Sequence, residues 1–174
     1  MHESDDRVDV ALGLDPIELA RRNWVDAGWA ASADGMAFVT SIVRVQQLVL
    51  GRIEELLRPH GLTFARFEVL RLLAFSRRGV LPVGKVGERL QVHPASVTNA
   101  VQRLEDAGFV VRQANPDDGR SVLAAITPAG RSLVERCTEL LNAEVFSALP
   151  LEAAQLDEGI ELLRELRRAL GDLG

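Results

Sequence analysis

The sequence predicts a mainly α-helical protein that carries one small β-hairpin. Apolar residues recur at helical spacing over long stretches, most clearly at residues 38–57 and 133–146. Two short β-branched segments, 108–113 and 121–126, flank a tip that is dense in turn residues. The 174 residues are 47% hydrophobic and 26% charged, which is enough apolar material for a folded core.

The first expected helix is short. Residues 1–14 are acidic and have the composition of a frayed tail. Asp15 then has the chemistry of a helix cap, and Pro16 suits the first helical position. We expect this helix to continue to about Trp29 and to dock through its apolar face, with Leu19 and Trp24 as contacts, before a polar break at residues 30–35.

The remaining elements follow from caps, breaks and periodicity. They are, in order, a long helix over 38–57, a helix over 64–75, a loop over 76–80, helices over 83–90 and 94–107, the two hairpin strands, a helix from Thr127-Pro128 to about Phe146, and a last helix over 151–170. Two short helices that are joined by a tight turn and followed by a hairpin are typical of a winged helix-turn-helix. The long helices outside it carry more apolar surface than one small lobe can cover, which predicts a homodimer.

The charge of the chain is unevenly distributed. Residues 77–131 carry a net charge of +3, whereas residues 1–76 carry −3 and residues 132–174 carry −5. A basic middle between acidic flanks is what a localised anionic partner requires. Chance fluctuation in a short window explains the same pattern, so the charge alone does not choose between the two.

The sequence argues against several classes of protein. The charge-free runs are too short or too polar to span a bilayer, and the first residues lack a secretory signal, so we expect a cytoplasmic protein with no membrane partner. The three histidines lie far apart, and the chain has no zinc spacing, catalytic triad or phosphate-binding loop, so we expect no metal, no cofactor and no enzymatic activity. The lone cysteine, Cys137, lies on an apolar stripe and is either a small core residue or a redox sensor.

Residues 81–130 resemble the winged-helix core of the MarR family of bacterial transcription regulators. Three pieces carry the resemblance: the helix end Arg103-Leu104-Glu105 before Ala107-Gly108, the wing tip with Pro116, Asp118 and Arg120, and the exit Ile126-Thr127-Pro128-Ala129-Gly130. With the flanking helices it covers roughly residues 36–171. The resemblance implies a homodimeric repressor or activator whose terminal helices intertwine and whose winged lobes read a palindrome.

This resemblance divides the chain into four parts: an N-terminal extension at 1–35, connecting helices at 36–76, the winged lobe at 77–130 and dimerisation helices at 131–174. Two features depart from the common plan. Gly84 and Gly87 lie in the first helix of the pair, which indicates either close packing or a softer helix. The extension is long and contains Trp24 and Trp29, whose role is packing or lining a pocket.

A recognition helix places small or hydrogen-bonding side chains in the major groove. The expected DNA-facing residues of helix 94–107 are Ala95, Ser96, Thr98, Asn99 and Gln102, with Val97, Val101 and Leu104 turned inward. Asn99 and Gln102 have the amide chemistry for bidentate pairing with adenine, and Arg103 is placed to bind phosphate. Each of these residues also fits an ordinary polar surface.

The predicted wing carries Arg120, which is placed to enter a narrow minor groove. Asp118 is expected to support an arginine by a paired contact, and Arg112 on the first strand is the suggested partner. A surface ion pair without a function accounts equally well for Asp118 and Arg112. Arg77, Arg78 and Lys85 are further candidates for phosphate contacts or plain solvated charges.

The resemblance also implies a small effector that binds between the helical body and the winged lobe. We expect an aromatic or fatty acid, and the candidate pocket residues are Trp24, Trp29, Arg44, Arg66 and Arg71. The sequence and the resemblance therefore predict a ligand-responsive, DNA-binding transcription regulator. The alternative is a winged-helix module that binds other proteins without reading DNA.

Overall fold

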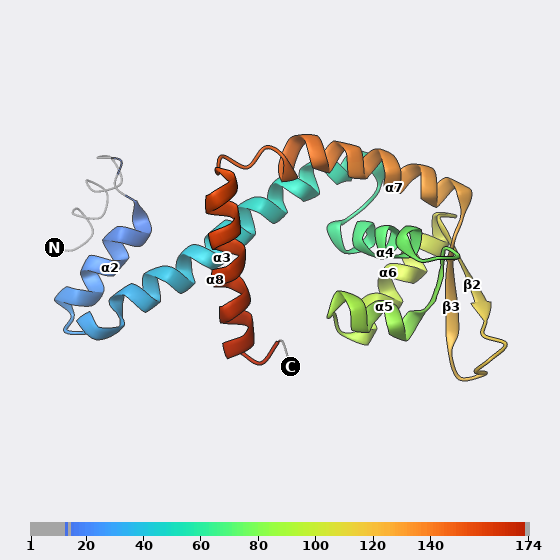
Figure 1. Cartoon of the computed structure of the whole chain (residues 1–174), viewed down its shortest axis with the longest axis horizontal. Coiled ribbons are helices and arrows are strands. Elements are labelled where there is room, and N and C mark those ends of the chain that lie inside the picture. Colours follow the sequence, from blue (N-terminus) through green and yellow to red (C-terminus); the bar gives the residue numbers. More distant parts are fainter. Residues whose placement is uncertain (1–12, 14, 173–174) are drawn as a thin grey trace. The chain divides into compact units, whose positions relative to one another are not determined.

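The computed structural model describes residue 13 and residues 15–172 of the chain. The chain divides into two compact units, Met1–Val69 and Leu70–Gly174. Helices dominate, and a small antiparallel sheet lies in the second unit, so the mainly α fold class is confirmed (Figure 1). The predicted acidic tail at residues 1–14 lies outside the described residues, apart from Gly13.

The first unit begins with the expected short helix, α2 (Pro16–Asp26). The Asp15 carboxylate caps it by accepting a hydrogen bond from the Ile17 amide at 2.9 Å. The long helix α3 (Ala30–Leu57) follows, then the 3-10 turn η1 (Arg58–His60) and the first residues of α4 (Phe64–Phe75).

The break between α2 and α3 is shorter than the sequence predicted. Gly28 adopts a left-handed conformation with φ of 88°, and this single residue already makes the turn. The following segment is rich in alanine, which favours helix, so α3 begins at Ala30 and the predicted break at residues 30–35 is wrong.

Helix α2 packs on the start of α3, as its cap and apolar spacing predicted. Ala33 of α3 is only 1% exposed, and Arg21 of α2 forms an ion pair with Asp34 of α3 at 3.3 Å. The rings of Trp24 and Trp29 meet edge to face with centroids 5.1 Å apart. The extension is therefore a docked helix rather than a free arm.

Helix α3 corrects the expectation about membrane spans. The continuous helical stretch Ala30–His60 is long enough to cross a bilayer and contains an 18-residue window apolar enough to do so, with a mean hydropathy of 1.2. Its large apolar side chains are mostly exposed in the single chain: Phe38, Val39, Val43, Val45 and Leu48. These apolar side chains are therefore left largely uncovered within the described part of their own unit.

The second unit contains the winged lobe and the C-terminal helices. Its elements are the rest of α4, β1 (Val80–Pro82), α5 (Val83–Leu90), α6 (Pro94–Asp106), β2 (Val110–Ala114), β3 (Val122–Ile126), α7 (Pro128–Leu141), the π-helical turn η2 (Asn142–Phe146) and α8 (Ala153–Ala169). The strand order is β1-β3-β2, with Val80 opposite Ala125 and Val110 opposite Ile126. The sequence did not predict β1, because three residues are too few to show alternation.

The core of this unit comes from the inward faces of the helices. Val97, Val101 and Leu104 of α6 are each at most 2% exposed, as their spacing predicted. Cys137 of α7 is fully buried, and burial raises the pKa of its thiol. Because the reactive form is the thiolate, this environment favours the interpretation of Cys137 as a core residue.

The two glycines of α5 have different surroundings. A Cβ on Gly87 would lie 3.3 Å from the Val97 side chain, so this glycine lets α5 and α6 approach closely. A Cβ on Gly84 would meet nothing within 4 Å. The close-packing interpretation therefore holds for Gly87 and not for Gly84.

Candidate nucleic-acid interface

The helix-turn-helix is built from α5, a short turn and α6. Helix α5 is followed by Gln91, a non-glycine residue in the left-handed region with φ of 54°. His93 then caps α6, because its Nδ1 atom accepts a hydrogen bond from the Ala95 amide at 3.2 Å. Pro94 takes the first helical position. His93 and Pro94 together therefore begin α6.

The outer face of α6 presents most of the expected side chains to solvent. Ala95, Ser96, Thr98 and Asn99 are exposed, and Gln102 is half-buried. The Thr98 hydroxyl donates to the Pro94 carbonyl at 3.0 Å. Among the described residues, the Asn99 amide has no hydrogen-bond partner, so both its donor and its acceptor are available to a base edge.

The tip of the wing is held by short side-chain turns. Asp118 Oδ1 accepts from the Arg120 amide at 3.0 Å, and Asn115 Oδ1 accepts from the Asp117 amide at 3.1 Å. Asn115 also donates to the Ser121 hydroxyl at 2.6 Å. Within the described part of the chain, the Arg120 guanidinium has no ion pair or hydrogen bond, which leaves its charge available.

The predicted pairing of Asp118 with Arg112 is wrong. Arg112 donates through Nε to Glu105 at 2.6 Å, through its backbone N–H to the same carboxylate at 3.0 Å, and through Nη2 to the Gln102 amide oxygen. Gln102 Nε2 in turn donates to Asp106 at 2.8 Å. Sequence reasoning missed Glu105 and Asp106, because the contact forms only when the chain turns at Gly108 and β2 returns past the end of α6.

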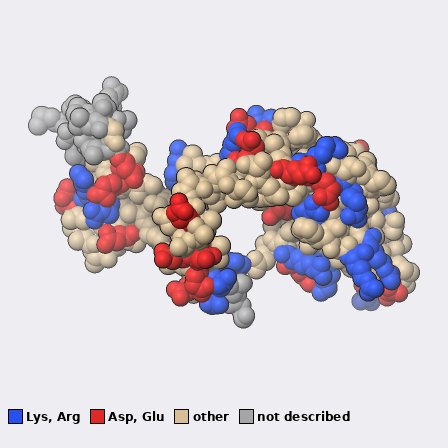
Figure 2. Space-filling model, turned by 45° about the horizontal axis from the view of Figure 1, so that its top comes forward, with Lys and Arg blue, Asp and Glu red and all other residues tan. Residues whose placement is uncertain are grey.

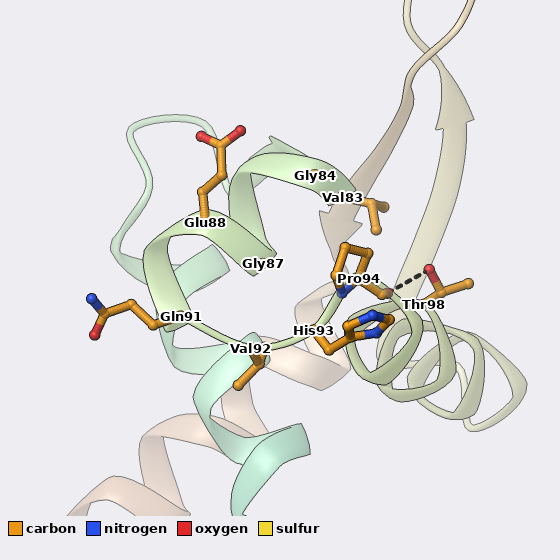
Figure 3. A pocket seen from close by; sticks show the side chains of 9 residues that line it. All are labelled: Val83, Gly84, Gly87, Glu88, Gln91, Val92, His93, Pro94 and Thr98. Carbon is orange, nitrogen blue, oxygen red and sulfur yellow. Dashed lines mark hydrogen bonds between the residues drawn. The ribbon is translucent and has the colours of Figure 1, made fainter. Parts of the chain in front are cut away.

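Two shallow grooves open beside the recognition helix. The first, of about 330 Å³, lies between α6 and the wing and is lined by Thr98, Arg112 and Arg120, among others. The second, of about 540 Å³, lies at the turn between α5 and α6 and includes His93 and Pro94 (Figure 3). Both grooves include Gly84 and Thr98, so the outer faces of α5 and α6 and the wing share one surface.

The remaining basic candidates lie in different settings. Arg77 and Arg78 line a third groove of about 710 Å³, together with wing residues and with Arg89, which the sequence did not single out. Lys85 is paired with Glu88 on the same helix at 2.7 Å. Figure 2 shows prominent groups of basic side chains along the lower edge of the winged lobe, at the right of the view. This surface suits an anionic partner.

Comparisons with known proteins agree with this geometry. The sequence profile described as the MarR family matches residues 60–121. The transcriptional repressor Rv2887 of Mycobacterium tuberculosis is 31% identical over 133 residues, which cover 76% of this chain and 90% of the relative. The chain belongs to the MarR family. Members of this family are DNA-binding transcription regulators and not enzymes, and this chain is one of them.

Solved structures of MarR proteins have the same fold. Sco5413 of Streptomyces coelicolor, a MarR-family transcriptional regulator, is 48% identical with a TM-score of 0.73, and the match covers 80% of this chain and 97% of that one. A mutant of MarR from Escherichia coli in complex with operator DNA is 26% identical with a TM-score of 0.70, covering 78% and 96% of the two chains. The match to a DNA complex supports DNA as the partner of this MarR protein.

The five candidates for an effector pocket in this MarR protein lie in separate local settings. Trp24 and Trp29 contact each other. Arg44 lines a groove of about 380 Å³ between α2 and α3, and the Arg66 Nε atom donates to the Thr63 hydroxyl at 3.1 Å. A shared pocket for these residues stays a prediction.

The fifth candidate, Arg71, already has a carboxylate partner. Its guanidinium forms two hydrogen bonds with Glu135, both at 3.1 Å, and lies 4.2 Å from the centre of the Phe75 ring. Its Nε atom is buried without a partner within the described residues. Arg71 would have to leave Glu135 before it served as the counter-charge of an acidic effector.

This ion pair predicts a pH dependence of stability. The hydrogen bond with Arg71 holds the pKa of Glu135 below its ordinary value of 4.5. A lowered pKa in the folded state contributes stability above the unfolded pKa, and that stability is lost as pH falls through the folded pKa. Arg71→Met keeps the packing over Phe75 and removes the pair. As the pH is lowered through and below 4.5, the ordinary pKa of Glu135, we expect the wild type to lose more thermal stability than this variant, measured by circular dichroism; parallel losses would contradict the prediction.

Proposed function

We propose that this MarR protein is a ligand-responsive repressor that binds a pseudo-palindromic operator as a homodimer. The observation that carries the proposal is that an exposed recognition helix and a wing arginine without a partner among the described residues lie on one surface. Asn99 offers both amide groups for base reading, and Arg120 offers a charge for the minor groove or the phosphates. The relative Rv2887 is a transcriptional repressor, which supports repression as the direction of regulation.

The unpartnered apolar faces support a dimer. In α8, Ile160, Leu162 and Leu163 are 54%, 51% and 47% exposed in the single chain. The apolar residues of α3 are similarly exposed. A soluble chain rarely leaves such faces open, and a second copy is the partner that a two-fold symmetric operator requires. In this proposal helix α3, although long enough to cross a bilayer, packs against a second copy of the protein rather than against lipid. The protein acts in the cytoplasm.

The effector proposal comes from the family resemblance and the chemistry of the candidates. A small aromatic or fatty acid would bind beside the helical body and change the fit of the two lobes to their half-sites. Such a ligand can shift the equilibrium only if it binds one arrangement of the lobes more tightly than the other. The direct readout is therefore a change in operator affinity when the acid is added.

Two measurements on the same protein test the dimer and the operator. Light scattering at micromolar concentration is expected to give about twice the chain mass of 19.0 kDa. Fluorescence anisotropy with duplexes from upstream of its own gene is expected to select a site with half-site centres about 10 base pairs apart, and affinity is expected to fall steeply with salt. Leu163→Glu places a charge on the exposed face of α8 and is expected to give a monomer with weak operator binding.

The matched control is Glu165→Gln on the exposed surface of the same helix, which is expected to leave the mass and the affinity unchanged. A wild-type monomer would contradict the two-half-site proposal. Equal affinity for random and upstream duplex would instead favour the protein-interaction alternative.

A further inference from the structure

We propose that Glu105 is a positioning residue that sets the selectivity of DNA binding. It does so by holding Arg112 and, through Arg112, the amide of Gln102 in one arrangement. The inference rests on the proposed function, because it concerns how the same surface reads a sequence. Four side chains form this arrangement where the end of α6 meets β2: Gln102, Glu105, Asp106 and Arg112.

The Glu105 carboxylate is held by two different parts of Arg112. One oxygen accepts from the backbone N–H of Arg112 at 3.0 Å, and the other accepts from Nε at 2.6 Å. Because one donor belongs to the backbone of β2, the carboxylate cannot move without also releasing the strand from α6. The guanidinium is thereby fixed in the groove between the recognition helix and the wing, which it lines together with Arg120.

The same contacts occupy both the oxygen and the nitrogen of the Gln102 amide. Its amide oxygen accepts from Arg112 Nη2, and its amide nitrogen donates to Asp106 at 2.8 Å. Bidentate recognition of adenine requires both the oxygen and the nitrogen of an amide. Gln102 therefore presents only its remaining N–H to the groove. Asn99, which has no partner among the described residues, becomes the amide that reads adenine.

The charge of Glu105 gives the arrangement its effect on selectivity. An unpaired Arg112 in this groove would attract any phosphate backbone, because the electrostatic part of DNA binding is independent of sequence. The Glu105 carboxylate neutralises that charge at 2.6 Å and directs the guanidinium. Neutralising Arg112 thus lowers affinity for every duplex, whereas the arrangement that Glu105 holds contributes only at the specific site, which is how specificity is gained at some cost in affinity.

The test compares Glu105→Gln with the wild type on two probes, a random-sequence duplex and the best-bound upstream duplex. We expect Glu105→Gln to bind the random duplex about fivefold more tightly, with a salt dependence steeper by about one phosphate contact. The ratio of specific to random affinity is expected to fall by about tenfold. A purely structural role for Glu105 cannot produce tighter binding to random DNA.

Two further variants keep the result interpretable. Glu139→Gln makes the same change in net charge on the exposed face of α7 and is expected to alter random-duplex affinity less than twofold. Glu105→Asp keeps the charge but shortens the side chain, so we expect random-duplex affinity near the wild type with a reduced specificity ratio.

The outcomes separate the two proposals. If Glu105→Gln weakens both duplexes in parallel, or changes neither, while the wild type discriminates between them, Glu105 does not set selectivity. If Glu105→Gln fails to fold, Glu105→Asp decides the question through its specificity ratio, and an unchanged ratio would overturn the positioning role. If the wild type binds both duplexes equally, the proposed function itself fails.

Discussion

Replacing Arg120 with alanine is expected to weaken binding to every duplex by about 2 kcal/mol, or about thirtyfold. The Arg120 guanidinium has no partner among the described residues, so its full charge is available to DNA. The wing tip that carries it is stiffened by the Asp118 and Asn115 turns, so little order has to be gained on binding. Because a charge contact acts on all sequences, the salt dependence is expected to become shallower by about one phosphate contact.

Asn99→Ala provides the contrasting result. Loss of the Asn99 side chain is expected to weaken the binding free energy by about 1–3 kcal/mol on the operator and by much less on random DNA, because this side chain reads a base rather than the backbone. Arg136→Ala, an exposed arginine on α7, is the control for net charge and is expected to have little effect on either duplex. Fluorescence anisotropy over a range of salt measures all three variants. Unchanged affinity in a folded Arg120→Ala protein would show that the wing does not contact DNA here.

Much of this interface could be predicted from local chemistry. The beginning of α6 follows from Pro94 at the first helical position, and its inward face follows from the spacing of Val97, Val101 and Leu104. The end of α6 follows from Ala107-Gly108, where Gly108 adopts a φ of 76°. These signals lie within one or two turns of the residues that they determine.

The features that the sequence did not predict depend on contacts between distant segments. Strand β1 exists because Val80–Pro82 pairs with β3, more than forty residues later in the chain. The Glu105–Arg112 contact depends on the path of β2 past the end of α6, and the Arg71–Glu135 pair joins α4 to α7. An ionic partner cannot be chosen from charge alone, since Arg112 has acidic residues both before and after it in the sequence.

The second large effect is expected at Gly130, where α7 begins against the turn that follows α6. A Cβ at this position would lie 2.2 Å from the Phe109 carbonyl oxygen and 3.1 Å from the Ile126 side chain. The carbonyl belongs to the backbone, so it cannot turn aside as the end of a flexible side chain would. Relieving the overlap requires α7 to move away from the hairpin.

That movement would disrupt the junction that Thr127 holds together. The Thr127 hydroxyl donates to the Gly108 carbonyl at 2.9 Å and accepts from the Gly130 amide at 3.0 Å, while the Thr127 amide donates to the Phe109 carbonyl at 3.0 Å. These bonds cap α7 and attach it to the recognition helix through the turn. Gly130→Ala is therefore expected to lower the free energy of unfolding by about 3 kcal/mol.

Gly84→Ala is the matched comparison, because it makes the same change in the same lobe at a position where a Cβ meets nothing within 4 Å. Since alanine favours helix over glycine, this variant is expected to be more stable by up to about 1 kcal/mol. Denaturant unfolding measures the stability of both variants. The protein concentration is kept the same for all samples, because the stability of a dimer depends on concentration. The two substitutions are thus expected to shift the midpoint in opposite directions. A Gly130→Ala midpoint equal to the wild type would show that α7 does not need this close approach to the turn.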